Sequence, residues 1–264
     1  MTPKPATSAE YRQAPAPPAP TARKYIEYPG KDLDAMAFAS NYRRWIMEML
    51  MPFIGRRIVE VGAGTGSFSE LFLATKPENL TVLEPSPNLH SRLTSHLPLL
   101  APAGNLKLLQ STFTEALADG IGMKARSFDT AVYINVLEHI EEDEAELSSV
   151  FEALPSGGRI LIFVPALSFL MSPMDREMGH FRRYSLQDLK TKCLSAGFSV
   201  PMARYFDVLG IVPWWIKFRL LKSTQLGPEA VRMHDRFVVP ISRALENLAT
   251  PPCGKNIILI GEKG

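Results

Sequence analysis

The sequence has little cysteine, no long apolar run and almost no net charge. Only two cysteines, Cys193 and Cys253, occur among 264 residues, and their spacing matches no zinc site. Two thiols in a chain of this size favour a reduced compartment, so we expect a cytoplasmic protein. No run of about 18 consecutive apolar residues is present, which excludes a transmembrane helix. The formal charge of +2 creates no global field for nucleic acid, so we expect no nucleic-acid partner.

The first 22 residues lack large apolar side chains and are dominated by proline and alanine. Such a segment cannot bury enough surface to offset the entropy of ordering it, so residues 1–22 are predicted to be a disordered tail. The remaining residues, 23–264, have the length of one domain that carries an insertion.

Three glycines at alternate positions follow a short apolar run near residue 60. Residues 57–61 are predicted to form a strand buried on both faces, and residues 67–75 the helix that follows it. Glycines in the turn between them permit strained backbone angles and let a ligand approach bare amides at the helix N-terminus. In the pattern E-x-G-x-G-x-G, Ser67 stands where a dinucleotide fingerprint has its third glycine, which disfavours an NAD site. A glycine-rich turn without a ligand is the alternative.

An acidic residue closes the second apolar run. Glu84 follows residues 80–83 and lies at the predicted carboxyl end of a strand. A carboxylate at this position is suited to bind the two hydroxyls of a ribose.

Strand and helix patterns alternate along the rest of the chain. Strand-like runs separated by helical segments predict a parallel sheet covered on both faces, with a ligand crevice at the carboxyl ends of the first, second and fourth strands. The predicted strands are 57–61, 80–84, 106–110, 128–134, 159–164, 198–206 and 256–260, and the predicted helices between them are 67–75, 87–97, 143–154 and 186–196.

Two further helical segments lie outside this alternation. Residues 33–51 repeat apolar side chains at helical spacing until Pro52 ends the pattern. An insertion at about 208–252 precedes the last strand. Its first part, 208–222, combines paired tryptophans and aliphatic residues with three cations. That composition suits an interfacial helix on an anionic membrane, which would place the protein at the inner membrane face; a pocket cap or a dimer interface are the alternatives.

From about residue 25 to its end, the chain resembles the class I S-adenosylmethionine (SAM) dependent methyltransferases. The motif at 60–66 resembles their first motif. The segments V-L-E-H-I, S-P-M-D-R-E-M-G-H-F-R-R-Y-S and G-K-N-I-I-L-I resemble a bacterial, type 11/12-like subgroup associated with glycosyltransferases. The resemblance implies a doubly wound, Rossmann-like α/β fold with a seven-stranded, mostly parallel sheet and a helical insertion before the last strand. It also implies that a helix before the first strand closes over the cofactor.

The resemblance implies SAM as the cofactor and a set of residues that bind it. Many relatives place an aspartate after the third strand for the adenine amino group, but this chain has none at 111–113, so Thr112 is expected to serve instead. The expected cofactor-binding residues are Glu60, Gly62, Ala63, Gly64, Gly66, Glu84, Pro85, Thr112 and Asn135.

Two histidines are candidates for the catalytic base. His139 follows the fourth strand and is suited to act as a base near working pH, and His180, in the long loop after the fifth strand, is the other candidate. A structural role for His139, in which it orients the loop through Glu138, is the alternative. Some quinone O-methyltransferases carry a related E-x-x-E-H metal site, but this chain has Asn135 where their first glutamate stands, so we expect no metal.

The loop at 172–185 is predicted to be a lid over the acceptor. Arg182, Arg183 and Tyr184 of this loop, together with Tyr42 of the helical segment at 33–51, are the candidate substrate-binding residues. The arginines are suited to hold an anionic acceptor. The alternatives are a core position for Tyr42 and pairing of the arginines with Asp175 and Glu177.

The predicted function is O-methylation of a small-molecule, sugar or lipid-linked acceptor. N-methylation, which needs no strong base, and a non-catalytic SAM-fold scaffold or regulatory protein are the alternatives. The sequence does not specify an oligomeric state.

Overall fold

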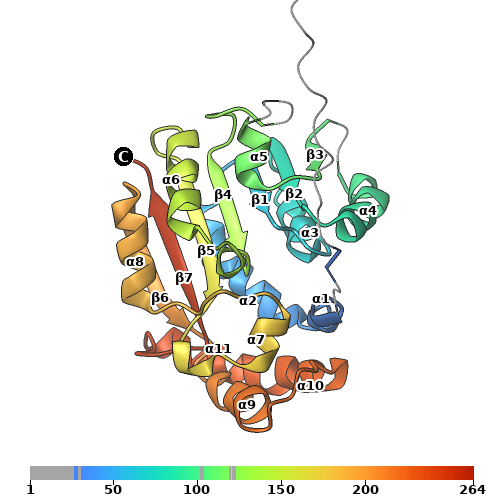
Figure 1. The fold of residues 1–264 in the computed structure, drawn as a ribbon, viewed down its shortest axis with the longest axis vertical. Helices are drawn as coiled ribbons and strands as arrows, with labels where there is room; N and C mark the ends of the chain where they lie inside the picture. Colours follow the sequence, from blue (N-terminus) through green and yellow to red (C-terminus); the bar gives the residue numbers. More distant parts are fainter. Residues whose placement is uncertain (1–26, 29–30, 102–103, 119, 121–122) are drawn as a thin grey trace, which may run out of the picture.

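The computed structural model describes residues 27–28, 31–101, 104–118, 120 and 123–264, so the predicted tail at 1–22 lies outside the described residues. The described chain contains a seven-stranded sheet of order β3-β2-β1-β4-β5-β7-β6 (Figure 1). The strands are β1 (Arg57–Val61), β2 (Asn79–Leu83), β3 (Leu106–Leu109), β4 (Thr130–Ile134), β5 (Arg159–Pro165), β6 (Ser199–Phe206) and β7 (Asn256–Glu262).

All strand pairs are parallel except the two made by β7, which is antiparallel to both β5 and β6. The predicted strands are confirmed, and their bounds differ from the observed ones by at most two residues. The doubly wound, mostly parallel α/β fold is therefore the one that the alternating pattern predicts.

Helices cover both faces of the sheet and bury two apolar clusters. In β1, Ile58 packs into the cluster that contains Trp45 and Leu93, while Val59 packs into the opposite cluster, which contains Leu147 and Leu189. A strand that packs on both faces must be apolar on both, which explains the continuous run that this strand shows in sequence. The helices flanking the sheet are α3 (Ser67–Ala74), α4 (Pro87–His96), α5 (Phe113–Ala118), α6 (Asp143–Ala153) and α8 (Leu186–Ser195).

The single helix predicted at 33–51 is wrong, because the chain forms two helices there, α1 (Lys31–Met36) and α2 (Ser40–Leu50). The guanidinium of Arg43 donates to the carbonyls of Met36 and Ala37 at the end of α1. The carboxylate of Asp235, almost two hundred residues later, accepts the N–H groups of Asn41 and Tyr42 at the start of α2. Side chains thus satisfy the backbone groups that the break leaves open.

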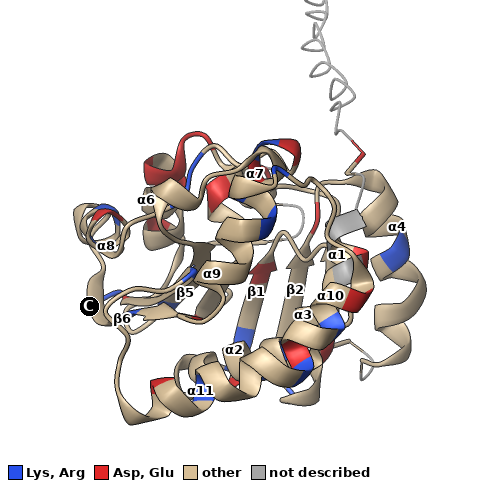
Figure 2. Ribbon diagram, turned by 90° about the horizontal axis from the view of Figure 1, so that it is seen from below, with Lys and Arg blue, Asp and Glu red and all other residues tan. Residues whose placement is uncertain are grey.

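The insertion before β7 is helical, as predicted, and two of its turns are π-helical. It lies at the end of the sheet to which β4 points, beside α1 and α7 (Figures 1 and 2). Its elements are α9 (Ile211–Trp214), the π-helical η5 (Trp215–Leu220), α10 (Pro228–Met233), the π-helical η6 (His234–Val238) and α11 (Val239–Leu248).

Short helical turns connect several of these elements. Among the described residues, none of the helices has both the length and the apolar character needed to cross a bilayer. The short turns are η1 (Met51–Phe53), η2 (Leu97–Leu99), η3 (Leu137–His139), η4 (Ser168–Leu170) and α7 (Pro173–Glu177).

Candidate functional site

The glycine loop between β1 and α3 has the conformation that its spacing predicts. Gly62, Gly64 and Gly66 adopt φ values of +67°, +59° and +84°. A Cβ atom added at Gly62 would lie 2.7 Å from Val136, and one at Gly66 would lie 2.7 Å from Leu93. Side chains are therefore excluded from this loop by both backbone conformation and space.

Glu84 faces the glycine loop. One oxygen of its carboxylate accepts the N–H of Gly64 at 2.7 Å, and the other accepts the N–H of Ser86 at 2.9 Å. Burial raises the pKa of Glu84, and the two N–H donors oppose that rise. The loop is further tied to β2, since the N–H groups of Gly62 and Ala63 both donate to the carbonyl of Leu83.

Glu60 has a different neighbour. It lies in β1, where it is the acidic position marked in Figure 2, and its carboxylate accepts the hydroxyl of Ser69 in α3. Burial raises the pKa of Glu60 to about 8, partly opposed by the bond from Ser69. Glu60 thus connects β1 to α3 beneath the glycine loop. Any effect of Glu60 on a cofactor would be indirect, through the position of these two elements.

The chain before β1 covers the glycine loop. The side chain of Leu33 in α1 lies 3.1 Å from the position of a Cβ atom on Gly64. The N–H of Tyr28 donates to the hydroxyl of Ser86, 3.0 Å away, directly after Glu84. The segment that the resemblance expects over the cofactor therefore lies at the glycine loop.

The other three residues expected to bind the cofactor, Thr112, Pro85 and Asn135, differ in whether other protein groups already bind their polar atoms. The hydroxyl of Thr112 accepts the N–H of Glu115 while the Glu115 carboxylate accepts the N–H of Thr112, so this side chain caps α5. The carbonyl of Pro85 accepts the side-chain amide of Gln110. Asn135 is exposed directly after β4, with a positive φ of +52°, and lines a pocket at this edge of the sheet.

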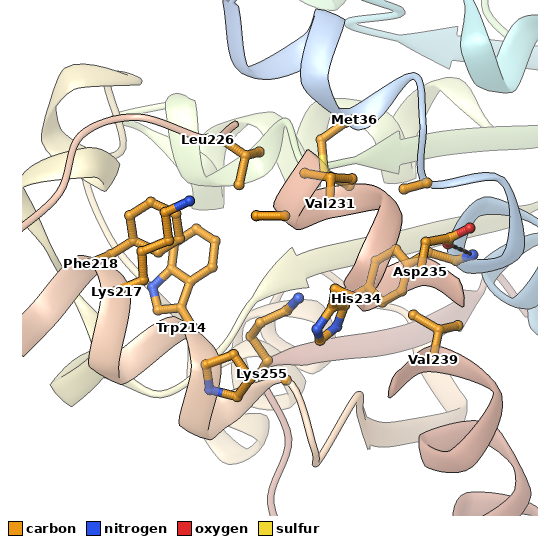
Figure 3. A pocket seen from close by; sticks show the side chains of 15 residues that line it. Met36, Trp214, Lys217, Phe218, Leu226, Val231, His234, Asp235, Val239 and Lys255 are labelled. Carbon is orange, nitrogen blue, oxygen red and sulfur yellow. Dashed lines mark hydrogen bonds between the residues drawn. The ribbon is translucent and has the colours of Figure 1, made fainter. Parts of the chain in front are cut away.

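Two adjoining cavities lie between the sheet edge and the insertion. The first, called the edge cavity below, has Asn135, Glu138, His139, His180 and Arg183 among its polar lining residues. The second, the apolar cavity, lies among α1, α2, α9 and α10 (Figure 3). The two cavities share Met36, Tyr42, Trp214, Leu226 and Lys255 in their walls.

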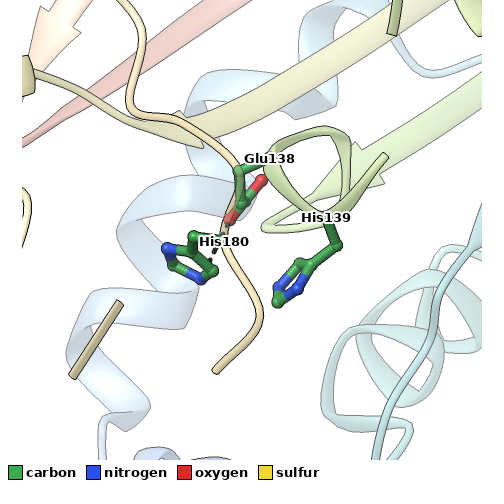
Figure 4. A group of neighbouring side chains, drawn as sticks. All are labelled: Glu138, His139 and His180. Carbon is green, nitrogen blue, oxygen red and sulfur yellow. Dashed lines mark ion pairs between the residues drawn. The ribbon is translucent and has the colours of Figure 1, made fainter. Parts of the chain in front are cut away.

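The two candidate bases lie together in the edge cavity. The ring centroids of His139 and His180 are 4.6 Å apart, and the rings meet edge to face (Figure 4). Nδ1 of His180 is 3.1 Å from Oδ1 of Asp175, and the other ring nitrogen, Nε2, lies on the side of Glu138. Burial, together with the neighbouring His180, lowers the pKa of His139 to about 4. His139 is therefore a neutral imidazole at physiological pH and a weak base.

The expected substrate residues separate into two pairs. Tyr42 lies in the wall shared by both cavities, where its hydroxyl donates to Asn256 at 3.0 Å. Arg183 lines the edge cavity and pairs with Asp175 at 2.7 Å, as its alternative interpretation proposed. Both residues remain within reach of an acceptor.

Arg182 and Tyr184, the other two expected substrate residues, are absent from the linings of both cavities. The hydroxyl of Tyr184 is fully buried and donates to Asp143 at 2.7 Å. Arg182 also pairs with Asp143, at 2.8 Å, and not with Glu177. Both residues attach the loop after α7 to the start of α6. Successive side chains of an extended segment point to opposite sides, which is why Arg183 faces the cavity while its neighbours face away.

Sequence analysis missed two residues at the junction of the cavities. Lys255 places its ammonium 4.8 Å from the Tyr42 ring centroid and 2.7 Å from Asp207. Trp214 stacks on the guanidinium of Arg183 at 4.7 Å. The only signal for Lys255 was its place directly before the last strand, and the aromatic composition of 208–222 did not distinguish Trp214 from its neighbours.

Comparisons with known proteins agree with this architecture. The sequence model of a family described as "Methyltransferase domain" matches residues 32–201. No curated protein matches the chain in sequence.

Solved structures share the fold at low sequence identity. The putative methyltransferase that forms a complex with the Trm112 activator of Haloferax volcanii has a TM-score of 0.59 and 15% identity, over 90% of this chain and 97% of that one. A SAM-dependent methyltransferase from Archaeoglobus fulgidus has a TM-score of 0.56 and 16% identity, over 88% and 99% of the two chains. One from Mesorhizobium loti has a TM-score of 0.54 and 15% identity, over 83% and 98%.

Proposed function

Because the chain belongs to the methyltransferase domain family and uses SAM as its methyl donor, we propose that it O-methylates an amphiphilic acceptor. The acceptor's hydroxyl would lie in the edge cavity and its apolar body in the apolar cavity. One observation carries the proposal: a cavity that has Glu138, His139 and His180 in its lining adjoins a more apolar cavity, through a shared wall that contains Tyr42 and Trp214.

The glycine loop and Glu84 fit the cofactor. Bare amides at a helix N-terminus accommodate a polar ligand, and each Glu84 oxygen retains acceptor capacity beyond its one N–H donor. When bound, SAM supplies a methyl group whose transfer to a hydroxyl forms a C–O bond, leaves the S–C electron pair on sulfur and releases the hydroxyl proton. The chain must therefore hold the acceptor oxygen in line with the methyl carbon and the sulfur, and it must receive one proton.

The lining of the edge cavity supports oxygen as the methylated atom. Nε2 of His180 and both oxygens of Glu138 are acceptor atoms without a hydrogen bond to the protein among the described residues. Groups of this kind receive or redistribute the proton that a hydroxyl loses, whereas an unprotonated amine requires no such help. Asn135, at the end of β4, would orient the acceptor or the cofactor from the opposite wall.

The surface of the insertion supports a lipid-linked acceptor. Trp215, Ile216, Leu220 and Leu221 are exposed on η5 and directly after it, and no acidic residue occurs between Asp207 and Glu229. Arg219 and Lys222 are exposed beside them. An apolar surface with cations suits the interface of an anionic membrane, so the insertion would deliver a membrane-borne acceptor to the apolar cavity.

The proposal is tested with purified full-length protein, SAM carrying a labelled methyl group, and a lipid extract and an aqueous metabolite extract of the source cells. We expect label to appear in the lipid fraction as a methyl ether or ester. The variant Ala230→Trp places a large side chain in the wall of the apolar cavity. It should raise KM for the acceptor and leave SAM affinity unchanged, because Ala230 lines the apolar cavity and not the edge cavity.

Three results would contradict the proposal in different ways. Label in an amine product would replace O-methylation by N-methylation. Label only in the aqueous fraction, with no effect of Ala230→Trp, would remove the amphiphilic acceptor. SAM binding without transfer to either extract would favour a scaffold or regulatory role.

A further inference from the structure

Glu138 is a buried carboxylate without a hydrogen-bond partner. It lies in η3 with none of its side chain exposed, and neither of its oxygens has a hydrogen bond among the described residues. A buried carboxylate requires a compensating group, either a proton or a cation. The nearest guanidinium does not serve, since Arg183 donates its N–H groups to Asp175 and to the carbonyl of Ala166.

His180 is oriented toward this carboxylate by a second one. Its Nδ1 is bound to Asp175, and its Nε2 lies 4.0 Å from Oε1 of Glu138. Asp175 is itself fixed by the N–H and hydroxyl of Ser172. A carboxylate that holds the far nitrogen of an imidazole sets the tautomer and orientation that a metal-binding histidine needs.

His139 completes the group from the opposite side. Its ring meets that of His180 edge to face, with the ring centroids 4.6 Å apart, and an unprotonated imidazole nitrogen is a metal ligand. Figure 4 shows Glu138 and His139 from η3 and His180 from the loop after α7 converging on one space. One donor atom from each residue lies within 4.8 Å of the other two.

We propose that Glu138, His139 and His180 bind one divalent transition-metal ion at the polar end of the edge cavity. Bonds of about 2.1 Å hold ligand atoms roughly 3 to 4 Å apart, so small side-chain rotations bring the three donors to bonding distance. Two imidazoles and one carboxylate suit Zn²⁺, Mn²⁺ or Fe²⁺ better than Mg²⁺ or Ca²⁺, which prefer oxygen ligands. Three protein ligands leave further positions open toward the cavity.

In the proposed O-methylation, an ion bound at this site would activate the acceptor hydroxyl. This role of the ion rests on the proposed function. A cation beside the acceptor hydroxyl lowers the pKa of the hydroxyl. His180 and His139 would then act as ligands, and the released proton would pass to solvent. If no ion binds, Glu138 is instead compensated by a proton and the histidines are the remaining proton acceptors.

Metal binding is measured directly on the full-length protein. The protein is treated with a chelator, dialysed, and titrated with ZnCl₂ by calorimetry and with CoCl₂ by visible absorption. We expect one ion per chain and a Co²⁺ spectrum of a site with nitrogen and oxygen ligands. Glu138→Gln, His139→Ala and His180→Ala should each weaken Zn²⁺ binding by at least about tenfold.

His90→Ala is the matched control, because His90 lies in α4 and lines neither cavity. It should bind Zn²⁺ like the unmodified chain, and SAM titration should confirm that every variant retains its folded cofactor site. Absence of one-to-one binding, or equal affinity in His180→Ala and His90→Ala, overturns the metal site. Methyl transfer at an undiminished rate by the chelated protein overturns its catalytic role and leaves O-methylation standing, whereas Zn²⁺ binding without any O-methylation does the reverse.

Discussion

At the scale of single residues, the glycine loop depends on the absence of side chains. Gly64 has a positive φ, donates its N–H to Glu84 and lies beneath Leu33 of α1. A side chain there would strain the backbone and fill the space between the loop and α1. The N–H of Gly64 also donates the hydrogen bond that orients Glu84, directly after β2, so this bond connects the two motifs expected to bind the cofactor.

Gly64→Val should abolish SAM binding while the chain stays folded. A β-branched residue at positive φ costs roughly 1 to 3 kcal/mol, and its side chain occupies the ligand's side of the loop. Gly157→Val is the control, since Gly157 also has positive φ, at +76°, but a Cβ atom there meets open space. Calorimetric titration with SAM should show loss of binding in the first variant only. Equal affinity in both would place the cofactor elsewhere.

Glu60 predicts a pH dependence of stability. Burial raises its pKa to about 8 from an ordinary value of 4.5, so between these values the folded chain keeps a proton that the unfolded chain has lost. The contribution of Glu60 to the free energy of unfolding is therefore present below pH 4.5 and declines as the pH rises toward 8. Glu60→Gln does not titrate, so its stability relative to the unmodified chain should increase by roughly 2 to 4 kcal/mol between pH 5 and pH 8. Urea unfolding at both pH values measures the change, and parallel curves for the two chains would contradict it.

At the scale of elements, the insertion before β7 both lines the apolar cavity and fixes the start of α2. Asp235 of η6 accepts the first N–H groups of α2, and α10 supplies one wall of the apolar cavity. Both η5 and η6 are π-helical, a form that often occurs at functional sites. The apolar cavity is therefore made mainly by elements outside the parallel sheet.

Asp235→Ala should lower stability by about 1 to 2 kcal/mol, because it removes the cap on α2. Asp34→Ala provides the comparison, since Asp34 is an exposed carboxylate paired only with Arg92 and should cost at most about 0.5 kcal/mol. Thermal unfolding of the two variants distinguishes these costs. A loss in Asp235→Ala no larger than that in Asp34→Ala would show that the tertiary cap contributes little.

At the scale of the whole molecule, the glycine loop, the edge cavity and the exposed apolar residues of the insertion all lie at the end to which the parallel strands point. Leu221 is 70% exposed, beside the exposed cations Arg219 and Lys222. This arrangement gives the proposed membrane contact a direct geometric relation to the apolar cavity, because η5 contributes Lys217 and Phe218 to the wall of that cavity.

The full-length protein should therefore co-sediment with vesicles that contain phosphatidylglycerol and much less with vesicles of phosphatidylcholine alone. Leu220→Glu with Leu221→Glu should reduce binding to the anionic vesicles, since charged residues are costly in the interface. Leu248→Glu is the control, because Leu248 lies at the end of α11 and is 85% exposed, more than Leu220 or Leu221. Equal binding of all three proteins, or none, would contradict membrane contact and leave the face to a dimer or another partner.

The sequence by itself determined the seven strands, their order along the chain and the glycine loop. These features depend on local pattern: buried strands are continuously apolar, and a loop that must expose its backbone is made of glycine. Contacts between residues far apart in the chain were decided only by the tertiary structure. These include the break between α1 and α2, the separation of Arg183 from Arg182 and Tyr184, and the meeting of Glu138, His139 and His180 in one buried group. No local pattern records such contacts, because the two sides of each are brought together only when the helices and loops pack against the sheet.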